Sequence, residues 1–270
     1  MIFLAIILFL IAMLCLYLWL IGGRVGHPVL RELRKWSFAH RGLHDAQKPE
    51  NSMAAFRAAL EHGYGIELDL HLMKDGNLGV IHDSNLKRVA NADVRIEDLT
   101  VSDLSNYKLS ETQEGIPLFD DVLALFDGKA PLIVELKCVD GNFDALCRAA
   151  MEKLDRYRGT YCVESFDPRV TAWFRKHRPQ ICRGQLNENW MGKKLPVPGI
   201  LRFFMTYHIS NVYTRPDFIA YKFADRGAFG TELCRKVMGV AGVSWTIRTK
   251  EDYDTAVKGG WIPIFENFTI

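Results

Sequence analysis

Two histidines and two carboxylates stand out between residues 40 and 83, because each lies within or at the end of a short apolar run. His40 ends the first run, Glu67 and Asp69 interrupt the second, and His82 ends the third. Histidine exchanges protons near neutral pH, and paired carboxylates suit a cation. Catalytic residues of strand-built sites often lie at strand ends in such sets. The spacing therefore predicts acid–base chemistry beside a bound ion.

The two carboxylates belong to the segment 66–70, which has the alternation of a strand. Its aliphatic residues share one face, and Glu67 and Asp69 share the other. Two neighbouring acids repel each other unless one is protonated or a cation lies between them. Oxygen ligands favour a hard ion such as Ca²⁺ or Mg²⁺. A solvated strand face is the alternative for this pair alone, and the strand-end histidines weaken it.

A second acidic segment, 133–137, adds a third carboxylate and a base. Strand alternation places Glu135 and Lys137 on one face of this segment, and Arg41 directly follows the first histidine. Three carboxylates, a divalent ion and two basic groups make a site suited to a phosphate ester. Other residues predicted at strand ends near this site are Ser165, Gln185 and Trp245.

These residues must be positioned by a regular scaffold, and the chain alternates short apolar runs with helical segments. The predicted strands are 36–41, 66–70, 131–137, 161–166, 180–186, 218–223, 243–247 and 261–266. Strands that alternate with helices favour parallel pairing, and eight units predict a closed TIM (β/α)₈ barrel with its site at the strand carboxyl ends. An open doubly wound sheet is the alternative. The sequence contains no GxGxxG or GxxxxGK[ST] motif for a nucleotide.

The alternation is interrupted after the second strand. Only five residues separate Leu72 from Leu78, too few for a crossover helix, so 78–82 is predicted to return as a hairpin strand. The segment 84–116 is polar with weak periodicity. We therefore predict a small insertion at about 71–117.

The N-terminus is an uninterrupted apolar segment, Ile2 to Ile21, long enough to cross the hydrocarbon core of a bilayer. A cleaved signal peptide is the alternative, but no Lys or Arg precedes the segment. We predict a transmembrane anchor at 1–23, a basic linker at 24–36 and one barrel domain at 37–270. The basic residues after the anchor favour a single-pass protein with its domain on the cytoplasmic side.

Composition excludes some other classes of partner and site. The 270-residue chain has a net charge of +2 and no basic stripe interleaved with aromatics, so nothing indicates nucleic acid binding. Its six cysteines form no CxxC pair, which leaves zinc-site spacing absent and a disulfide framework unsupported.

From about Phe38 to the C-terminus, the sequence resembles the glycerophosphodiester phosphodiesterase family. The motifs that carry the likeness are His40-Arg41-Gly42, Pro49-Glu50-Asn51-Ser52, Glu67-Leu68-Asp69, Asp75-Gly76, His82-Asp83, Glu135-Leu136-Lys137 and Ser244-Trp245-Thr246. The resemblance implies a TIM barrel with an insertion after the second strand. It also implies hydrolysis of a glycerophosphodiester to glycerol 3-phosphate and an alcohol.

The resemblance further implies a role for each candidate residue. One divalent cation, Ca²⁺ or Mg²⁺, would be bound by three carboxylates, with two histidines as the acid–base pair and two basic residues on the phosphate. In that order the residues are Glu67, Asp69 and Glu135; His40 and His82; and Arg41 and Lys137, with Trp245 beside the glycerol or alcohol. The family usually ends in a Gly-Ile-Ile-Thr-Asp-like strand, whereas this chain has Ile262-Pro263-Ile264-Phe265-Glu266-Asn267.

Two other functions remain open at this level. The anchor makes a lipid-derived substrate plausible, so the same site is compatible with a lysophospholipase D-type activity. A catalytically silent, membrane-anchored binding barrel is the third hypothesis. Glu50 has two interpretations, as an acid favoured at a helix N-terminus or as a partner of Arg41. The remaining histidines, including His71 and His208, are expected at the surface or at helix ends.

Overall fold

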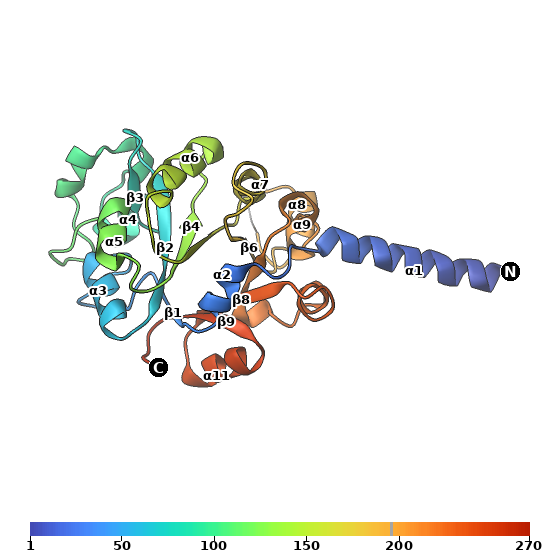
Figure 1. Ribbon diagram of the computed structural model, residues 1–270. Coiled ribbons are helices and arrows are strands. Elements are labelled where there is room, and N and C mark those ends of the chain that lie inside the picture. The colour runs from blue at the N-terminus through green and yellow to red at the C-terminus, as the bar shows by residue number, and fades with distance from the viewer. Residues whose placement is uncertain (195–196) are drawn as a thin grey trace.

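The computed structural model describes every residue except 195 and 196. Within the described residues, eight parallel strands close into a barrel, because β1 pairs with both β2 and β9 (Figure 1). This closure confirms the predicted TIM barrel and excludes the open sheet. The barrel strands are β1 (Phe38–His40), β2 (Gly65–Leu72), β4 (Leu132–Leu136), β5 (Tyr161–Ser165), β6 (Arg183–Asn187), β7 (Phe218–Lys222), β8 (Ala241–Ile247) and β9 (Trp261–Phe265).

Helices surround the barrel, and local side chains cap the N-termini of two of them. The Ser52 hydroxyl accepts the Ala55 N–H at 3.1 Å, and Asp167 caps the helix that begins at Pro168. The helices of the described residues that cover the barrel are α2 (Pro28–Leu33), α3 (Met53–Glu61), α5 (Phe119–Phe126), α6 (Phe143–Leu154), α7 (Pro168–His177), α8 (Gly199–Thr206), α9 (Asn211–Thr214), η3 (Phe223–Asp225), α10 (Phe229–Glu232), η4 (Leu233–Val237) and α11 (Lys250–Lys258).

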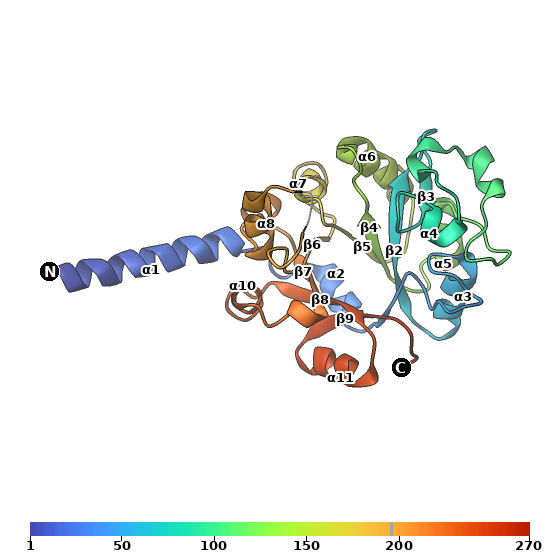
Figure 2. The same cartoon turned by 180° about the vertical axis from the view of Figure 1, so that it is seen from behind.

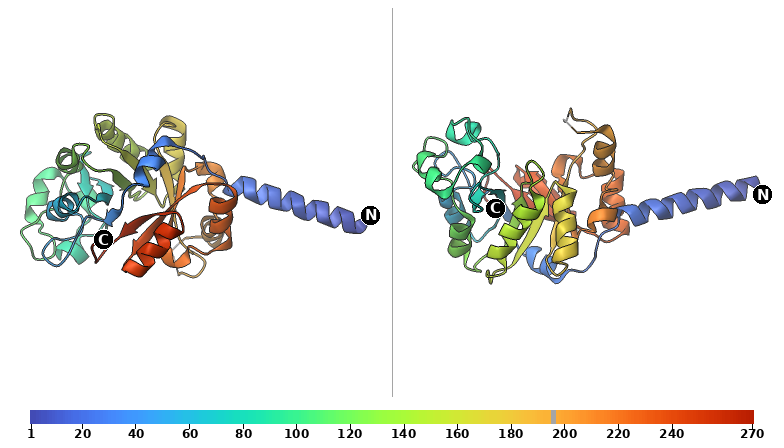
Figure 3. Two further views of the ribbon diagram at one scale, coloured as in Figure 1. Left: turned by 60° about the horizontal axis from the view of Figure 1, so that its bottom comes forward. Right: turned by 90° about the horizontal axis from the view of Figure 1, so that it is seen from above.

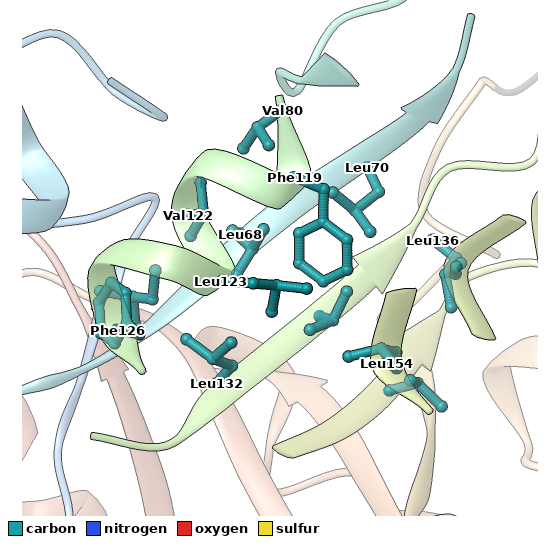
Figure 4. Close-up of a cluster of buried hydrophobic side chains, with 14 of the residues drawn as sticks. Leu68, Leu70, Val80, Phe119, Val122, Leu123, Phe126, Leu132, Leu136 and Leu154 are labelled. Carbon is teal, nitrogen blue, oxygen red and sulfur yellow. The ribbon is translucent and has the colours of Figure 1, made fainter. Parts of the chain in front are cut away.

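Strand β2 shows how alternation separates the core from the site. Leu68 and Leu70 face outward and pack in the same buried cluster as Phe119 of α5 (Figure 4). Glu67 and Asp69 therefore point into the barrel, where both are buried. Burial of the leucines under the helix fixes the register of the strand, since a one-residue slip would place the acids in the apolar layer.

An apolar floor fills the barrel below the acidic residues. The side chains of this inner cluster include Phe38, Ile133, Cys162, Leu186, Phe218 and Ile264, each from a different strand. The floor excludes water from one side of the acidic residues, which makes their electrostatic interactions strong.

The predicted hairpin and insertion are present. Strand β3 (Leu78–Val80) pairs antiparallel with β2. The following segment, which lies beside β3 (Figure 2), contains α4 (Lys87–Ala90), η1 (Ile96–Asp98) and η2 (Val101–Asn106). It packs around a small hydrophobic core of its own. The insertion therefore has a defined structure beside the barrel mouth.

The N-terminal helix α1 (Ile2–Ile21) extends away from the barrel (Figures 1 and 3). It has a mean hydropathy of 3.0 and is long and apolar enough to cross a membrane, although a signal sequence has the same properties. The predicted linker, 24–36, packs against the barrel, because α2 buries Leu30 and Leu33, and Arg24 pairs with Asp217. The division into anchor, linker and barrel domain stays a prediction.

Candidate active site

Three buried carboxylates meet at the carboxyl ends of two neighbouring strands. The parallel register pairs Asp69 of β2 with Glu135 of β4, and Glu67 lies one inward position earlier on β2. One oxygen from each of the three lies within 4.8 Å of the others. This cluster is suited to hold a cation, because buried acids at such distances repel strongly when they are ionised.

The pKa values of the three carboxyls reflect this crowding. Burial and the neighbouring acids raise the pKa of Glu67 well above its usual range, and burial raises that of Glu135 to about 7. Burial also opposes ionisation of Asp69, but Lys137 is the largest of the opposing influences that hold its pKa well below the ordinary value. The Lys137 ammonium lies 2.9 Å from Asp69 Oδ1 and 2.7 Å from Glu135 Oε2.

His40 lies at the end of β1 beside the carboxylates. Its Nδ1 is 2.5 Å from Glu266 Oε2, and its Nε2 is 3.9 Å from Glu67 Oε2. Burial lowers the pKa of His40, and Glu266 opposes the shift. A carboxylate on Nδ1 fixes the ring and leaves Nε2 to exchange a proton.

His82 follows β3 at the start of the insertion and has a matching arrangement. Its Nδ1 lies 2.6 Å from Asp83 Oδ1, and Arg88 holds the second oxygen of Asp83 at 2.6 Å. Burial lowers the pKa of His82 to about 4. Both histidines are therefore oriented by a carboxylate, although one ends a barrel strand and the other follows the hairpin strand β3.

Arg41 connects the first histidine to the acids through its backbone and its side chain. Its backbone N–H donates to Glu67 Oε2 at 3.2 Å, and its Nε lies 3.4 Å from Asp69 Oδ2. Its Nη1 donates to Glu50 at 2.9 Å, and Glu50 also binds Arg88. Glu50 is therefore a partner of Arg41, the second of its two interpretations.

Trp245 closes the site from β8. Its indole N–H donates to the Ala220 carbonyl at 3.1 Å, and its ring meets Phe166 edge to face with centroids 5.6 Å apart. Six of the eight predicted residues line one small cavity. The other two form ion pairs with lining residues, Asp69 with Arg41 and Lys137 with Glu135. The lining includes His40, Arg41, Glu67, His82, Glu135 and Trp245.

Comparison with known proteins shows which family the chain belongs to. The model of the glycerophosphoryl diester phosphodiesterase family matches residues 40–270. The chain belongs to this family. Membership makes it a phosphoric diester hydrolase and confirms the family predicted from the motifs.

Curated relatives and a solved structure agree with this membership. A glycerophosphodiester phosphodiesterase of Caldanaerobacter subterraneus is 30% identical over 82% of this chain and 89% of that protein. One from Bacillus altitudinis is 35% identical, over 53% of this chain and 63% of its own length. The solved structure of an Oleispira antarctica phosphodiesterase contains the product sn-glycerol-3-phosphate. It superposes on this chain with a TM-score of 0.69 at 19% identity, covering 87% of this chain and 93% of that chain. This likeness shows a common fold.

The phosphodiesterase site also contains three residues that the sequence analysis did not assign. Glu164 of β5 is 2% exposed, lines the same small cavity, and has no hydrogen-bond partner for Oε2 among the described residues. The Asn51 amide donates to Asp69 Oδ2 at 2.8 Å. Glu266 occupies the divergent C-terminal strand end and binds His40. The alternation Cys162-Val163-Glu164 is the sequence signal for an inward acid.

Ser165 and Gln185, expected at the mouth, instead hold backbone groups. The Ser165 hydroxyl donates to the Leu136 carbonyl at 2.7 Å, and the Gln185 amide donates to the Ser165 carbonyl at 3.0 Å. His71 is buried, not at the surface, and its nitrogens contact Glu97 at 2.6 Å and the backbone of His82 at 3.1 Å. These three side chains therefore support the site from outside the reacting region.

The net charge of the fully ionised site would be balanced by one divalent ion. Four inward carboxylates, those of β2, β4 and β5, face two permanent cations, Arg41 and Lys137. Full ionisation would leave two negative charges, which matches the charge of a single Ca²⁺ or Mg²⁺. Glu164 is one of these four acids, and burial raises its pKa well above normal because its Oε2 has no hydrogen-bond partner or cation among the described residues.

A second, larger cavity of about 770 Å³ adjoins the phosphodiesterase site. Glu135 and Lys137 lie on its wall, so the cavity begins at the acidic cluster. The apolar part of its lining includes Phe166, Trp190, Val197, Leu201 and Met205. A cavity with one charged end and one apolar wall suits an amphiphilic ligand.

Proposed function

We propose that this chain hydrolyses glycerophosphodiesters to glycerol 3-phosphate and an alcohol. Its family membership and the product complex of the Oleispira relative support the reaction class. The observation that carries the proposal is the arrangement of Glu67, Asp69 and Glu135 beside two histidines, each held by a carboxylate. That set combines electrostatic stabilisation of a phosphate with proton transfer on both sides of it.

We further propose that Glu67, Asp69 and Glu135 bind one divalent cation, Ca²⁺ or Mg²⁺. The all-oxygen donor set and the two uncompensated negative charges support a hard ion. When bound, the ion supplies positive charge that polarises the phosphoryl oxygen. Asn51 fixes one carboxylate orientation by donating to Asp69.

His40 and His82 are proposed as the acid–base pair. One imidazole takes a proton from the nucleophile, and the other donates a proton to the leaving alcohol oxygen. Both rings present Nε2 because their Nδ1 atoms lie against Glu266 and Asp83, whose carboxylates accept from N–H. The nucleophile is either water or a glycerol hydroxyl that forms a cyclic phosphate.

Arg41 and Lys137 are proposed to hold the phosphate, and Trp245 to line the glycerol or alcohol side. Both basic groups already neutralise the acidic cluster at distances of 3.4 Å or less, so they carry charge where a phosphate would approach. Trp245 offers an apolar ring over the same cavity. No part of this proposal involves nucleic acid.

The helix α1 is proposed as a single-pass membrane anchor with the barrel on the cytoplasmic side. Its length and exposed apolar surface support an anchor, and the basic residues that follow support the orientation. The alternative, a signal sequence, predicts a mature chain without α1, which N-terminal sequencing of the expressed protein would detect.

The reaction is tested with the full chain in detergent and glycerophosphocholine as substrate. Release of glycerol 3-phosphate is measured with Ca²⁺, Mg²⁺ or a chelator. We expect metal-dependent release that is lost in His40→Ala and retained in the control His62→Ala, which changes an exposed histidine. Folded protein that binds the ion but releases no product from any diester would favour the silent binding barrel instead.

A second candidate is a lysophospholipase D-type activity, and the 770 Å³ cavity favours it. The apolar wall formed by Leu201 and Met205 would accept an acyl chain while the phosphate lies at Lys137. Water would then replace the headgroup, which gives free choline and lysophosphatidic acid but no glycerol 3-phosphate. Following choline and glycerol 3-phosphate together on lysophosphatidylcholine separates the two activities.

A further inference from the structure

Exposed apolar side chains of the barrel domain are concentrated in one segment of the chain. Outside α1 and its N-cap Met1, twelve large hydrophobic residues are exposed among the described residues, and eight of them lie between residues 191 and 237. These eight are Met191, Ile200, Phe203, Phe204, Tyr207, Tyr213, Phe229 and Val237. Because isolated exposed hydrophobics are normal but clustered ones mark interaction sites, we define this set as the aromatic face.

Helix α8 contributes an ordered stripe to the aromatic face. Ile200, Phe203, Phe204 and Tyr207 recur at intervals of three and four residues, which places them on one side of the helix and its C-terminal cap. On another side, Leu201 and Met205 line the large cavity. The helix therefore separates the substrate cavity from the exposed stripe, and both of its sides are apolar.

The aromatic face lies at the base of α1. The Tyr17 hydroxyl donates to the Tyr207 carbonyl at 3.2 Å, and the Asn211 amide donates to the Ile21 carbonyl at 2.7 Å. Arg215 donates to the Trp19 carbonyl at 2.7 Å. Ile21 is fully buried against the barrel in one cluster with residues of β7 and η4. These contacts fix the barrel relative to the helix, with α8 and α10 beside its point of entry (Figure 2).

The charge of the same region differs from that of the rest of the chain. Residues 191–240 carry eight lysines and arginines against three acidic residues, whereas the whole chain has a net charge of only +2. The remainder is therefore net negative. Aromatic side chains with surrounding basic groups are the combination that binds an anionic lipid surface.

We propose that the aromatic face docks on the anionic lipid surface of the bilayer that holds α1. This inference rests on the proposed anchor and not on the reaction. Docking places α8 at the boundary between lipid and cavity, so an amphiphilic diester reaches Lys137 from the bilayer with its apolar chain along Leu201 and Met205. The site would thus act on substrates in the membrane as well as on soluble ones.

Photo-cross-linking in full-chain proteoliposomes tests the docking directly. Benzoylphenylalanine replaces Ile200 or Phe229, which are 62% and 70% exposed, in equimolar phosphatidylcholine and phosphatidylglycerol. Phe9 of α1 is the positive control, and Val101 of η2 is the exposed negative control. The insertion that contains η2 lies on the opposite side of the barrel from α1 (Figure 1). We expect lipid adducts at 9, 200 and 229 and none at 101.

Two results would overturn the inference. Adducts at position 9 with only background at 200 and 229 would show an anchored barrel that does not touch lipid. An absence of adducts at position 9 would remove the anchor on which the face depends. Neither outcome depends on turnover, so a failure of the proposed reaction is recognised separately, as a lack of product from the unaltered chain.

A matched pair of variants tests the consequence for substrate access. The double variant Ile200→Ser/Phe229→Ser is compared with Val101→Ser on lysophosphatidylcholine in vesicles and on soluble glycerophosphocholine. We expect the double variant to lose about tenfold of its vesicle turnover, because apolar area leaves the membrane contact, with soluble turnover unchanged. Equal losses on both substrates, or no loss on either, would contradict the proposed route.

Discussion

The two halves of the barrel mouth are built differently. In the ionic half, the carboxyl-terminal parts of β1, β2, β4 and β5 carry His40, Asp69, Glu135 and Glu164, and Glu266 directly follows β9. In the apolar half, β6 and β8 present Leu186 and Trp245, and α8 adds the apolar wall of the large cavity. The contrast divides the mouth into a half suited to phosphate and metal and a half suited to the variable alcohol.

The difference teaches how tolerant each half should be to substitution. Ionic side chains here hold one another, as Lys137 does with two acids, so removing one leaves a buried partner uncompensated. Apolar side chains of the cavity wall contribute contact area, and a change there alters fit rather than charge. Substitutions in the ionic half should therefore reduce the turnover of every substrate, and substitutions in the apolar half should change the preference among substrates.

The largest effect is expected for His82→Ala, which removes one proton-transfer group. Turnover of glycerophosphocholine should fall about 10²–10⁴-fold, the usual contribution of general acid–base catalysis. Cation binding, measured by calorimetry, should stay largely intact because His82 is not among the three proposed ligands. Full activity in this variant would refute the assignment.

Glu67→Gln should have the next largest effect. It removes one negative charge from the cluster while keeping the shape of the side chain, so cation affinity should weaken by about 100-fold or more. Titration of Ca²⁺ and Mg²⁺ into the variant and the unaltered chain measures the change. Unchanged affinity for both ions would exclude Glu67 as a ligand.

Glu266→Gln addresses a positioning residue of the ionic half. A glutamine still accepts from His40 Nδ1 but carries no charge, so turnover should fall about tenfold with cation affinity retained. Because Glu266 opposes the lowering of the His40 pKa, its loss should lower that pKa further. An acidic limb of the pH profile that is the same in the variant and the unaltered chain would show that Glu266 does not affect the pKa of His40.

A smaller, selective effect is expected in the apolar half. Leu201→Trp adds bulk to the wall of the 770 Å³ cavity and should reduce turnover of lysophosphatidylcholine about tenfold. Glycerophosphocholine, which has no acyl chain, should be affected less than about twofold. Equal loss for both substrates would mean that the cavity does not distinguish them.

His208, beside the apolar half, should affect stability and not turnover. It is fully buried with Nε2 2.9 Å from Thr231, and burial lowers its pKa from 6.5 to about 4. Between these values the unfolded chain binds the extra proton, so stability is complete above about pH 6.5 and falls as the pH falls. Lowering the pH from about 7 to about 5 should cost about 2 kcal/mol through this residue.

The variant His208→Asn isolates that contribution. Asparagine tolerates the positive φ of 58° at this position, and it does not titrate. The free energy of unfolding of the unaltered chain and of the variant is measured by denaturant titration at about pH 7 and about pH 5. On lowering the pH, the unaltered chain should lose about 2 kcal/mol more than the variant. A constant difference would show that the burial of His208 is not coupled to its protonation.

The sequence by itself determined the eight alternating strands, the hairpin strand and the eight candidate residues that lie around one site, whereas closure into a barrel was predicted with an open sheet as the alternative. Strand alternation and strand ends are local properties, so Glu67, Asp69, His40 and His82 were visible without the fold. Parallel strands then bring their carboxyl ends to one mouth, whichever helices lie between them. The assignments of chemical roles came from the family likeness.

Only the tertiary structure decided what surrounds these residues. His40 and Glu266 are 226 positions apart, and no local pattern pairs them. His208 lies at a helix end, one of the two expected places, but its contact with Thr231 of α10 buries it completely. The large cavity and the aromatic face both depend on where α8 lies relative to β5 and α1. Such contacts arise from closure of the barrel and from helix packing, and a one-dimensional pattern contains neither.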